Sequence, residues 1–305
     1  MERIFSHYTH TAQSNGEYVI ALGKDVAILR TNGELIAHRK DLKNPYKAAF
    51  LSENAVLVEC SKLREYVIFS LQDGSDLLHI KMPKIDNSRP QFLVSPDKKH
   101  VYDLGIIGCE IVLIHIDLET QKASIVELEM GLRSTVDIKF DQQGVLCLLQ
   151  EHTEMIGGKA VTLCGVRYEY FDSALGIGSS YYWQSKWQFD APERALMFGS
   201  DTHSIITSKW NLYDVRQNTS RPWFNAEQIT DARGYSYNYH YAADGKYIVL
   251  TGMIQTLVID LEKEELAARY YTGTATGCIV GDFFWLPTDK GIVKKPFPII
   301  ENAAV

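Results

Sequence analysis

The amino-acid sequence predicts an all-β fold built from repeated small sheets, and three observations support this. Apolar residues come in short runs of four to six, rich in β-branched and aromatic side chains, which favours strands. None of these runs continues at helical spacing for ten residues. Turn residues separate the runs, and they recur at a nearly constant interval along the 305 residues.

The recurring turns mark a repeat. They are Asn15, Asn54, Asp97, Gln143, Asp201, Asp244 and Asp282, separated by 39, 43, 46, 58, 43 and 38 residues. The interval from the last mark through the C-terminus and on to the first mark is again 38 residues. A period of about 40–45 residues that holds four strands is typical of a β-propeller blade. One small twisted sheet cannot bury both of its faces, so neighbouring blades must cover them.

We therefore predict one domain over residues 1–305, a seven-bladed β-propeller with four-stranded antiparallel blades and a ring closed by pairing of the N- and C-terminal segments. The expected blades are 3–40, 45–82, 90–129, 134–189, 193–226, 236–271 and 275–305. Two ways of closing the ring stay open. Either Arg3–Tyr8 begins the first blade, or it completes the last blade beside the C-terminal strands.

Several turn segments resemble those of a known family. Ser95-Pro96-Asp97-Lys98-Lys99 and Ala243-Asp244-Gly245-Lys246-Tyr247 look like the Ser-Pro-Asp-Gly-Lys-Tyr turn of WD40-like propellers. Leu212-Tyr213-Asp214-Val215-Arg216 is similar to the segment that ends the third strand of those repeats. The chain thus resembles a divergent WD40-like propeller, and this resemblance implies a non-enzymatic scaffold that binds proteins. The motifs identify a fold rather than an activity.

Charge and cysteine content predict the surroundings of the chain. The net charge of −7 argues against nucleic acid and anionic membrane as partners. The N-terminal residues contain no apolar run of a secretory signal, and no uncharged stretch is long enough to span a bilayer. Five cysteines, an odd number without a Cys-x-x-Cys pair, are typical of a reducing compartment. We expect a cytoplasmic protein.

Candidate binding residues lie on one face of the predicted propeller. Numbering the strands of a blade a to d from the centre outward, the d–a and b–c connections share one face, here called the loop face, and the recurring turns lie on the opposite turn face. Loops that vary on a regular scaffold commonly carry binding. Arginines near the channel mouth could bind an acidic group, and tryptophans near strand ends could anchor a partner. The candidates are Arg64, Arg89, Arg133, Arg194, Arg233, Trp210 and Trp223.

Other polar and aromatic clusters are interpreted as structural. Glu151, His152 and Glu154 form a compact group that is a weak candidate for a metal site, but neighbouring residues on a loop seldom converge without a distant ligand. A solvated loop is favoured there. His115 lies in an apolar run and is expected as a hydrogen-bonded strand histidine. Alternating tyrosines at 235, 237, 239 and 241 are expected to pack between blades.

Three functions remain open at this point. The first is an interaction scaffold that binds a protein partner through the loop face, with no cofactor or metal. The second is a propeller enzyme of the lactonase or lyase kind, which needs at least three carboxylates or histidines converging at the channel mouth. The third is a sensor of an anionic small ligand, suggested by the arginines.

Overall fold

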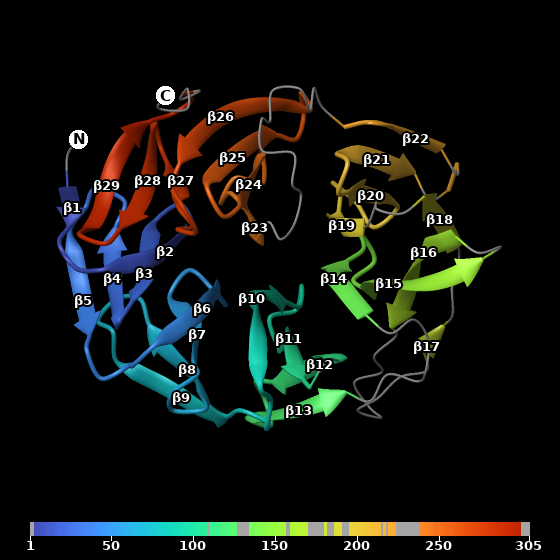
Figure 1. The fold of residues 1–305 in the computed structure, drawn as a ribbon. Helices are drawn as coiled ribbons and strands as arrows, with labels where there is room; N and C mark the ends of the chain where they lie inside the picture. The colour runs from blue at the N-terminus through green and yellow to red at the C-terminus, as the bar shows by residue number, and fades with distance from the viewer. Residues whose placement is uncertain are drawn as a thin grey trace.

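The structure is a computed structural model that describes residues 3–108, 110–126, 134–156, 159–169, 180–181, 186–190, 195–214, 216–217, 219–223 and 238–299. The regular secondary structure of these residues is entirely β-strand, as the short apolar runs predict. Within the same ranges, no helix has the length and apolar character that crossing a membrane requires. The strands form seven separate antiparallel sheets that radiate from a centre (Figure 1).

Three sheets in the first half of the chain follow the chain order, with each strand paired to the next. The first contains β2 (Thr9–Ser14), β3 (Tyr18–Gly23), β4 (Val26–Arg30) and β5 (Leu35–Arg39). The second contains β6 (Pro45–Phe50), β7 (Ala55–Cys60), β8 (Glu65–Ser70) and β9 (Asp76–Lys81). The third contains β10 (Asn87–Val94), β11 (His100–Ile107), β12 (Glu110–Asp117) and β13 (Lys122–Val126).

Three sheets follow in the second half. One contains β14 (Ser134–Phe140), β15 (Leu146–Ile156), β16 (Lys159–Glu169), β17 (Ser180–Tyr181) and β18 (Lys186–Asp190). The next contains β19 (Ala195–Phe198), β20 (Ser204–Thr207), β21 (Asn211–Asp214) and β22 (Thr219–Pro222). The third contains β23 (Asn238–Tyr241), β24 (Tyr247–Thr251), β25 (Gln255–Asp260) and β26 (Glu265–Tyr271).

The last sheet contains both ends of the described chain. Its order is β1 (Arg3–Phe5), β29 (Gly291–Pro296), β28 (Phe283–Thr288) and β27 (Cys278–Val280). Arg3 pairs with Val293, so the N-terminal segment supplies the outer strand beside the C-terminal strands. Of the two arrangements expected for the N-terminal segment, this is the second, in which it completes the last sheet. The first sheet therefore begins at Thr9 rather than at residue 3.

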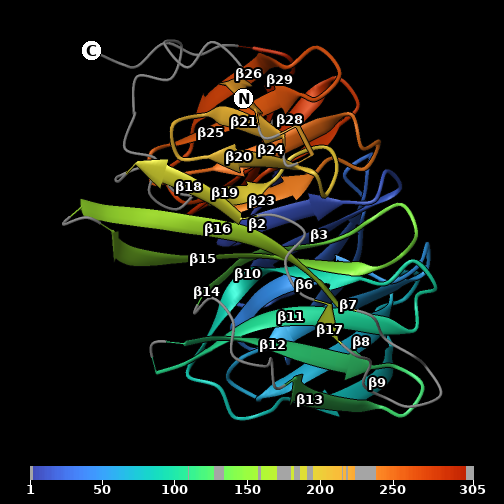
Figure 2. The ribbon, with the colours of Figure 1, turned by 90° about the vertical axis from the view of Figure 1, so that its right-hand side faces the viewer.

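Six of the sheets have four strands, and the prediction of seven four-stranded blades is wrong for the remaining one. There β15 and β16 pair along their whole length, from Leu146–Glu169 to Ile156–Lys159. Two short strands then share the edge of β16, with β17 against residues 168–169 and β18 against residues 161–165. The long hairpin offers more edge than one short strand covers, and this accounts for the longest interval between the recurring turns. Figure 2 shows β15 and β16 extending beyond their neighbours.

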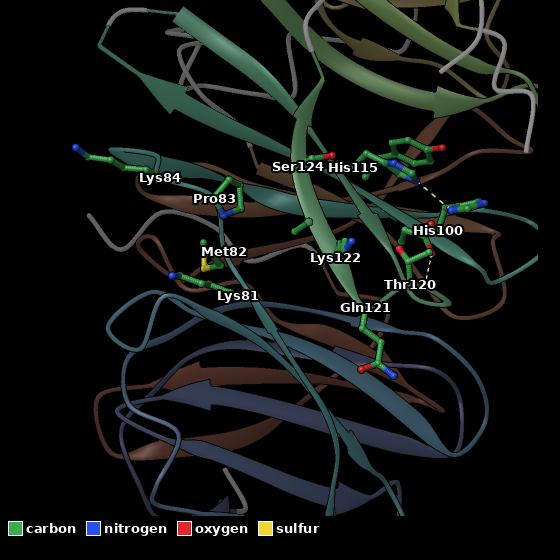
Figure 3. Close-up of a pocket in the computed structure, with 13 residues that line it drawn as sticks. Lys81, Met82, Pro83, Lys84, His100, His115, Thr120, Gln121, Lys122 and Ser124 are labelled. Carbon is green, nitrogen blue, oxygen red and sulfur yellow. Dashed lines mark hydrogen bonds between the residues drawn. The ribbon is translucent and has the colours of Figure 1, made fainter. Parts of the chain in front are cut away.

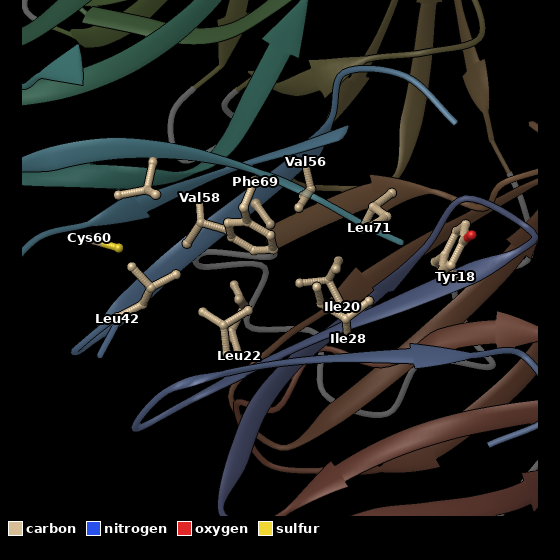
Figure 4. Close-up of a cluster of buried hydrophobic side chains, with 13 residues drawn as sticks. Tyr18, Ile20, Leu22, Ile28, Leu42, Val56, Val58, Cys60, Phe69 and Leu71 are labelled. Carbon is tan, nitrogen blue, oxygen red and sulfur yellow. The ribbon is translucent and has the colours of Figure 1, made fainter. Parts of the chain in front are cut away.

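The hydrophobic core lies between successive sheets rather than inside any one of them. One cluster joins the β2–β5 and β6–β9 sheets (Figure 4). Ile20 and Ile28 lie on one side, Val56 and Phe69 on the other, and all four are fully buried. Both faces of a blade are covered in this way, as the repeat predicts. At the centre, a cavity of about 290 Å³ is lined by residues of the inner strands β2, β6, β10, β14 and β23.

Candidate functional site

A small cavity lies at the loop face where the β6–β9 sheet meets the β10–β13 sheet, and we call it the junction cavity. Its volume is about 170 Å³. The lining residues come from the start of β6, the end of β7, the β7–β8 loop, the link between β9 and β10 and the start of β10. They are Tyr46, Glu59, Ser61, Arg64, Met82, Pro83, Ile85, Asp86, Asn87 and Ser88. A d–a and a b–c connection therefore meet at the junction cavity.

Irregular strand pairing positions the side chains beside this cavity. The β6–β7 register shifts between Pro45 and Ala48, and the β10–β11 register shifts between Ser88 and Phe92. A bulge increases the local twist and redirects nearby side chains. Lys47 lies within the first irregular stretch, and only 1% of its side chain is exposed. An amphipathic residue of an inner strand is thereby directed into the contact between two sheets.

Lys47 is the centre of a buried polar network. Its Nζ forms an ion pair with Asp103 Oδ1, and it lies 3.2 Å from Glu59 Oε2. The same Nζ donates to the carbonyl oxygen of Arg89 at 2.6 Å and to Ser88 Oγ at 2.8 Å. A lysine ammonium has three hydrogens to donate, so Asp103, Ser88 and Arg89 use its donors. The network bridges β6 and β7 of one sheet to β10 and β11 of the next.

The two carboxylates of the network have further donors. Ser88 Oγ donates to Glu59 Oε2 at 2.8 Å, and the Tyr66 hydroxyl donates to Asp103 Oδ2 at 2.9 Å. Glu59 and Asp103 are 1% and 0% exposed. Buried charges must be paired and hydrogen-bonded to be tolerated, and both conditions hold here. One lysine nevertheless faces two carboxylates, so the cluster holds an excess of acidic groups beside the junction cavity.

Burial dominates the electrostatics of this cluster. It raises the pKa of Glu59, and the positive charge of Lys47 offsets only part of that rise. Burial also raises the pKa of Tyr66, and the charge of Asp103 adds to it, so the Tyr66 hydroxyl keeps its proton and remains a donor. Burial likewise raises the pKa of Tyr46 at the cavity wall. The arrangement therefore supplies fixed charges and hydrogen-bond donors.

Two of the predicted arginines lie at this junction. Arg64 lines the junction cavity, Arg89 lies in β10, and both are exposed. Arg133, Arg194 and Arg233 lie outside the described residues, so the predicted ring of arginines stays a prediction. Across the described ranges, no group of three His, Cys, Asp or Glu side chains is placed to hold a metal ion.

The two predicted tryptophan anchors are buried, and their expected accessibility is wrong. Trp210 and Trp223 are each 4% exposed. Their rings stack with centroids 6.4 Å apart, and the Trp223 amide donates to the Trp210 carbonyl at 2.8 Å. Large aromatic rings stabilise a core by the area they bury, so these two join the cluster between the β19–β22 and β23–β26 sheets. Tyr239 and Tyr241 pack on the same cluster, as expected for tyrosines between blades, whereas 235 and 237 lie outside the described residues.

The weak metal candidates lie on a strand rather than on the expected solvated loop. The backbone of Glu151, His152 and Glu154 belongs to β15 and pairs with β16. The prediction of a loop failed because polar residues continue a hairpin here beyond its apolar part. Their side chains lie outside the described part of the structure.

His115 is a hydrogen-bonded strand histidine, as predicted. Its Nε2 lies 3.1 Å from His100 Nδ1, and its ring stacks on Tyr102. Burial lowers the pKa of His115, and the neighbouring His100 lowers it further. A cavity of about 670 Å³ extends from these histidines to the segment Lys81–Lys84. Figure 3 shows β13 passing between the histidine pair and that segment, so these basic groups do not converge.

Sequence reasoning missed the Lys47 network, although a signal for it was present. Glu59 and Asp103 each interrupt an apolar strand pattern between two core residues, and Lys47 directly precedes the buried Ala48. Charged residues are almost never fully buried unless they are paired. Three charges of mixed sign at core positions of neighbouring repeats therefore indicate a buried ion-pair cluster.

Comparison with known proteins identifies the fold. No family model matches the chain, and no curated protein matches it in sequence. Among solved structures, hydrazine synthase of Kuenenia stuttgartiensis is similar with a TM-score of 0.61 at 13% identity, covering 95% of this chain and 96% of that one. The β-propeller domain of Cps50 (Swd1) of Myceliophteria thermophila is similar with a TM-score of 0.56 at 12% identity, covering 97% and 99%. At these identities the likeness shows the fold alone, a β-propeller arrangement.

Proposed function

We propose that this propeller is a non-enzymatic interaction scaffold of the WD40-like kind, which binds a protein partner through its loop face. The distribution of exposed apolar side chains carries this proposal. The described residues include ten large apolar or aromatic side chains that are exposed, and six of them lie on the loop face. Those six are Tyr8, Tyr46, Leu63, Ile107, Met253 and Ile254.

The β24–β25 loop is the most apolar point of this surface. Met253 is 74% exposed and Ile254 is 54% exposed, side by side at the tip of the loop. Removal of apolar area from water is the main favourable contribution to most protein–protein association. Elsewhere on the loop face, the exposed Tyr46 and Arg64 line the junction cavity together, and aromatic residues with arginine are enriched in protein interfaces. A cytoplasmic location belongs to the same proposal, supported by the free, buried cysteines Cys60, Cys147 and Cys278.

A matched pair of double variants tests the proposal. Met253→Asp with Ile254→Asp places two charges on the loop face. Leu35→Asp with Leu77→Asp places two charges at the starts of β5 and β9, toward the turn face, where the leucines are 48% and 56% exposed. Each full-length variant is used for quantitative co-purification from native extract beside the wild type.

The expected result is a protein whose recovery falls about tenfold or more with the loop-face pair and stays unchanged with the turn-face pair, because truncating or charging a central anchor costs about 2 kcal/mol of binding free energy. Circular dichroism confirms that both variants fold. Identical recovery of every co-purified protein by the two double variants would contradict binding through the loop face.

A further inference from the structure

The junction cavity has charged groups of both signs on its wall. The acidic residues Glu59 and Asp86, the basic residue Arg64 and Tyr46, whose phenol has a raised pKa, all line it. Asn87 and Ser88 add neutral polar groups. Ligand sites combine a concave surface with a few fixed polar groups, which is the composition found here.

These charges do not neutralise one another across the cavity. Glu59 shares Lys47 with Asp103 on the buried side of the wall. Asp86 accepts a hydrogen bond from the Gly108 amide at 2.7 Å. Among the described residues, the Arg64 guanidinium has neither a hydrogen bond nor an ion pair, with these carboxylates or with any other group. Charges of opposite sign therefore line one small space without direct contact.

The backbone at Arg64 is an independent observation. Arg64 has a φ of 56°, in the left-handed region, where glycine is favoured and a β-carbon is strained. Its carbonyl accepts from the Met82 amide at 2.9 Å, which ties the β7–β8 loop to the β9–β10 link. Glycine would satisfy this backbone at lower cost. The turn itself therefore does not account for an arginine at this position.

The size of the cavity limits what it can hold. Pockets for drug-sized ligands measure about 300–1,000 Å³. The junction cavity, at about 170 Å³, is smaller than that range. Its ligand must therefore be a molecule of few non-hydrogen atoms.

We propose that the junction cavity binds a small zwitterion of the α-amino-acid class, with its ammonium group toward Glu59 and its carboxylate toward Arg64. Charge-assisted hydrogen bonds are about twice as strong as neutral ones, and arginine suits a carboxylate because its donors match the two oxygens. The excess of carboxylates over lysine on the buried wall favours a cation at that end. A single molecule that carries both charges satisfies both ends at once.

Calorimetric titration and thermal shift of the full chain test this site. The probes are glycine, L-alanine and L-serine, each up to about 10 mM, with methylamine and acetate as single-charge controls. We expect saturable binding and a raised melting temperature with at least one amino acid, and neither effect with methylamine or acetate at equal concentration.

Two glycine variants provide a matched comparison. Arg64→Gly removes the guanidinium at a backbone position that suits glycine, so the fold is retained. Lys98→Gly does the same at the β10–β11 turn on the opposite face, where Lys98 is exposed with a φ of 62°. We expect affinity to fall about tenfold or more in Arg64→Gly and to stay unchanged in Lys98→Gly.

Three outcomes would overturn the proposal: no binding of any of the three amino acids, binding of methylamine or acetate as strong as theirs, or unchanged affinity in Arg64→Gly. This site does not depend on the protein partner proposed above. Loss of partner binding in the loop-face variant and loss of amino-acid binding in Arg64→Gly are separate measurements.

Discussion

Two junctions between sheets hold a buried aspartate in different ways. At the β6–β9 and β10–β13 junction, Asp103 meets the charged ammonium of Lys47 and the hydroxyl of Tyr66. At the junction of β14, β19 and β23, the donors to Asp137 include two amides and a hydroxyl. The Ile138 and Phe198 amides donate to it at 2.8 and 2.7 Å, and the Tyr239 hydroxyl donates at 2.5 Å.

The lysines of the two junctions also differ. Lys139 lies two residues after Asp137 but donates to the carbonyl oxygens of Gly199 and Ser200, at 2.6 and 2.9 Å, and to the Tyr241 hydroxyl at 3.0 Å. It is half-buried, whereas Lys47 is fully buried between two carboxylates. Both lysines connect neighbouring sheets. Only Lys47 does so through desolvated ion pairs.

The two junctions therefore connect their sheets in different ways, one through hydrogen bonds of a half-buried lysine and the other through buried ion pairs. At Asp137, two amides and a hydroxyl donate hydrogen bonds to the carboxylate. A buried ion pair adds a desolvation penalty for both partners. Removing either partner strongly destabilises the fold because the other charge is left buried without its counter-ion. The Lys47 junction therefore depends on every member of its network, and it is also the junction that encloses a cavity at the loop face.

The largest expected effect follows from removing the buried ammonium. Lys47→Met keeps the length of the side chain but leaves Glu59 and Asp103 without their counter-ion. Breaking a buried pair costs about 3–5 kcal/mol of the free energy of unfolding. Urea unfolding of the variant and the wild type, followed by fluorescence, measures the loss.

Lys139→Met is the matched control at the other junction. It removes an ammonium that donates to two carbonyl oxygens and a hydroxyl, but Lys139 is only half-buried, and its loss leaves no charge buried without a partner among these three acceptors. We expect it to destabilise the protein less than Lys47→Met. Equal losses would show that the ion pairs at the first junction add nothing beyond ordinary hydrogen bonds.

A smaller effect separates the two buried aspartates directly. Tyr66→Phe and Tyr239→Phe each remove one hydroxyl that donates to a carboxylate. Hydrogen bonds to charged groups contribute about 1.5–3 kcal/mol. Tyr66 is fully buried and Tyr239 only partly, so water replaces the lost donor more easily at Asp137. We expect Tyr66→Phe to reduce the free energy of unfolding more than Tyr239→Phe in the same urea titration, and the opposite order would contradict this ranking.

The repeating part of this architecture could be predicted from the sequence because it follows from local patterns. Turn residues such as Asn15 and Asp244 precede short apolar strands, and both the period and the four-strand pattern of most sheets follow from them. The fifth strand beside β16 could not be predicted from the sequence. The pairing of β17 and β18 depends on how far the β15–β16 hairpin extends, and no local pattern determines that length.

The candidate site was predictable only in part. Arg64 was identified from its place in a b–c loop, and it does line the junction cavity. Trp210 was misplaced because proximity to a strand end says nothing about a partner such as Trp223, thirteen residues later, that covers it. Lys47 and Asp103 are 56 residues apart, and their contact depends on how one sheet packs on the next. Local sequence contains no information about that distance.

The smallest expected effect is a dependence on pH at Glu59. Burial raises the pKa of Glu59 in the folded protein above its ordinary value of 4.5. Between the unfolded and the folded pKa, the folded state holds a proton that the unfolded state has released. The contribution of Glu59 to stability is therefore present at low pH and is lost as the pH rises through the folded pKa.

Glu59→Gln keeps an acceptor for Ser88 but does not titrate. The stability of wild type relative to Glu59→Gln should therefore decrease from pH 4.5 upward, measured by urea unfolding at a series of pH values, with the exposed Glu53→Gln as the control for loss of one charge. A relative stability that instead increases with pH would contradict this prediction. It would mean that the attraction of Lys47 lowers the pKa of Glu59 by more than burial raises it.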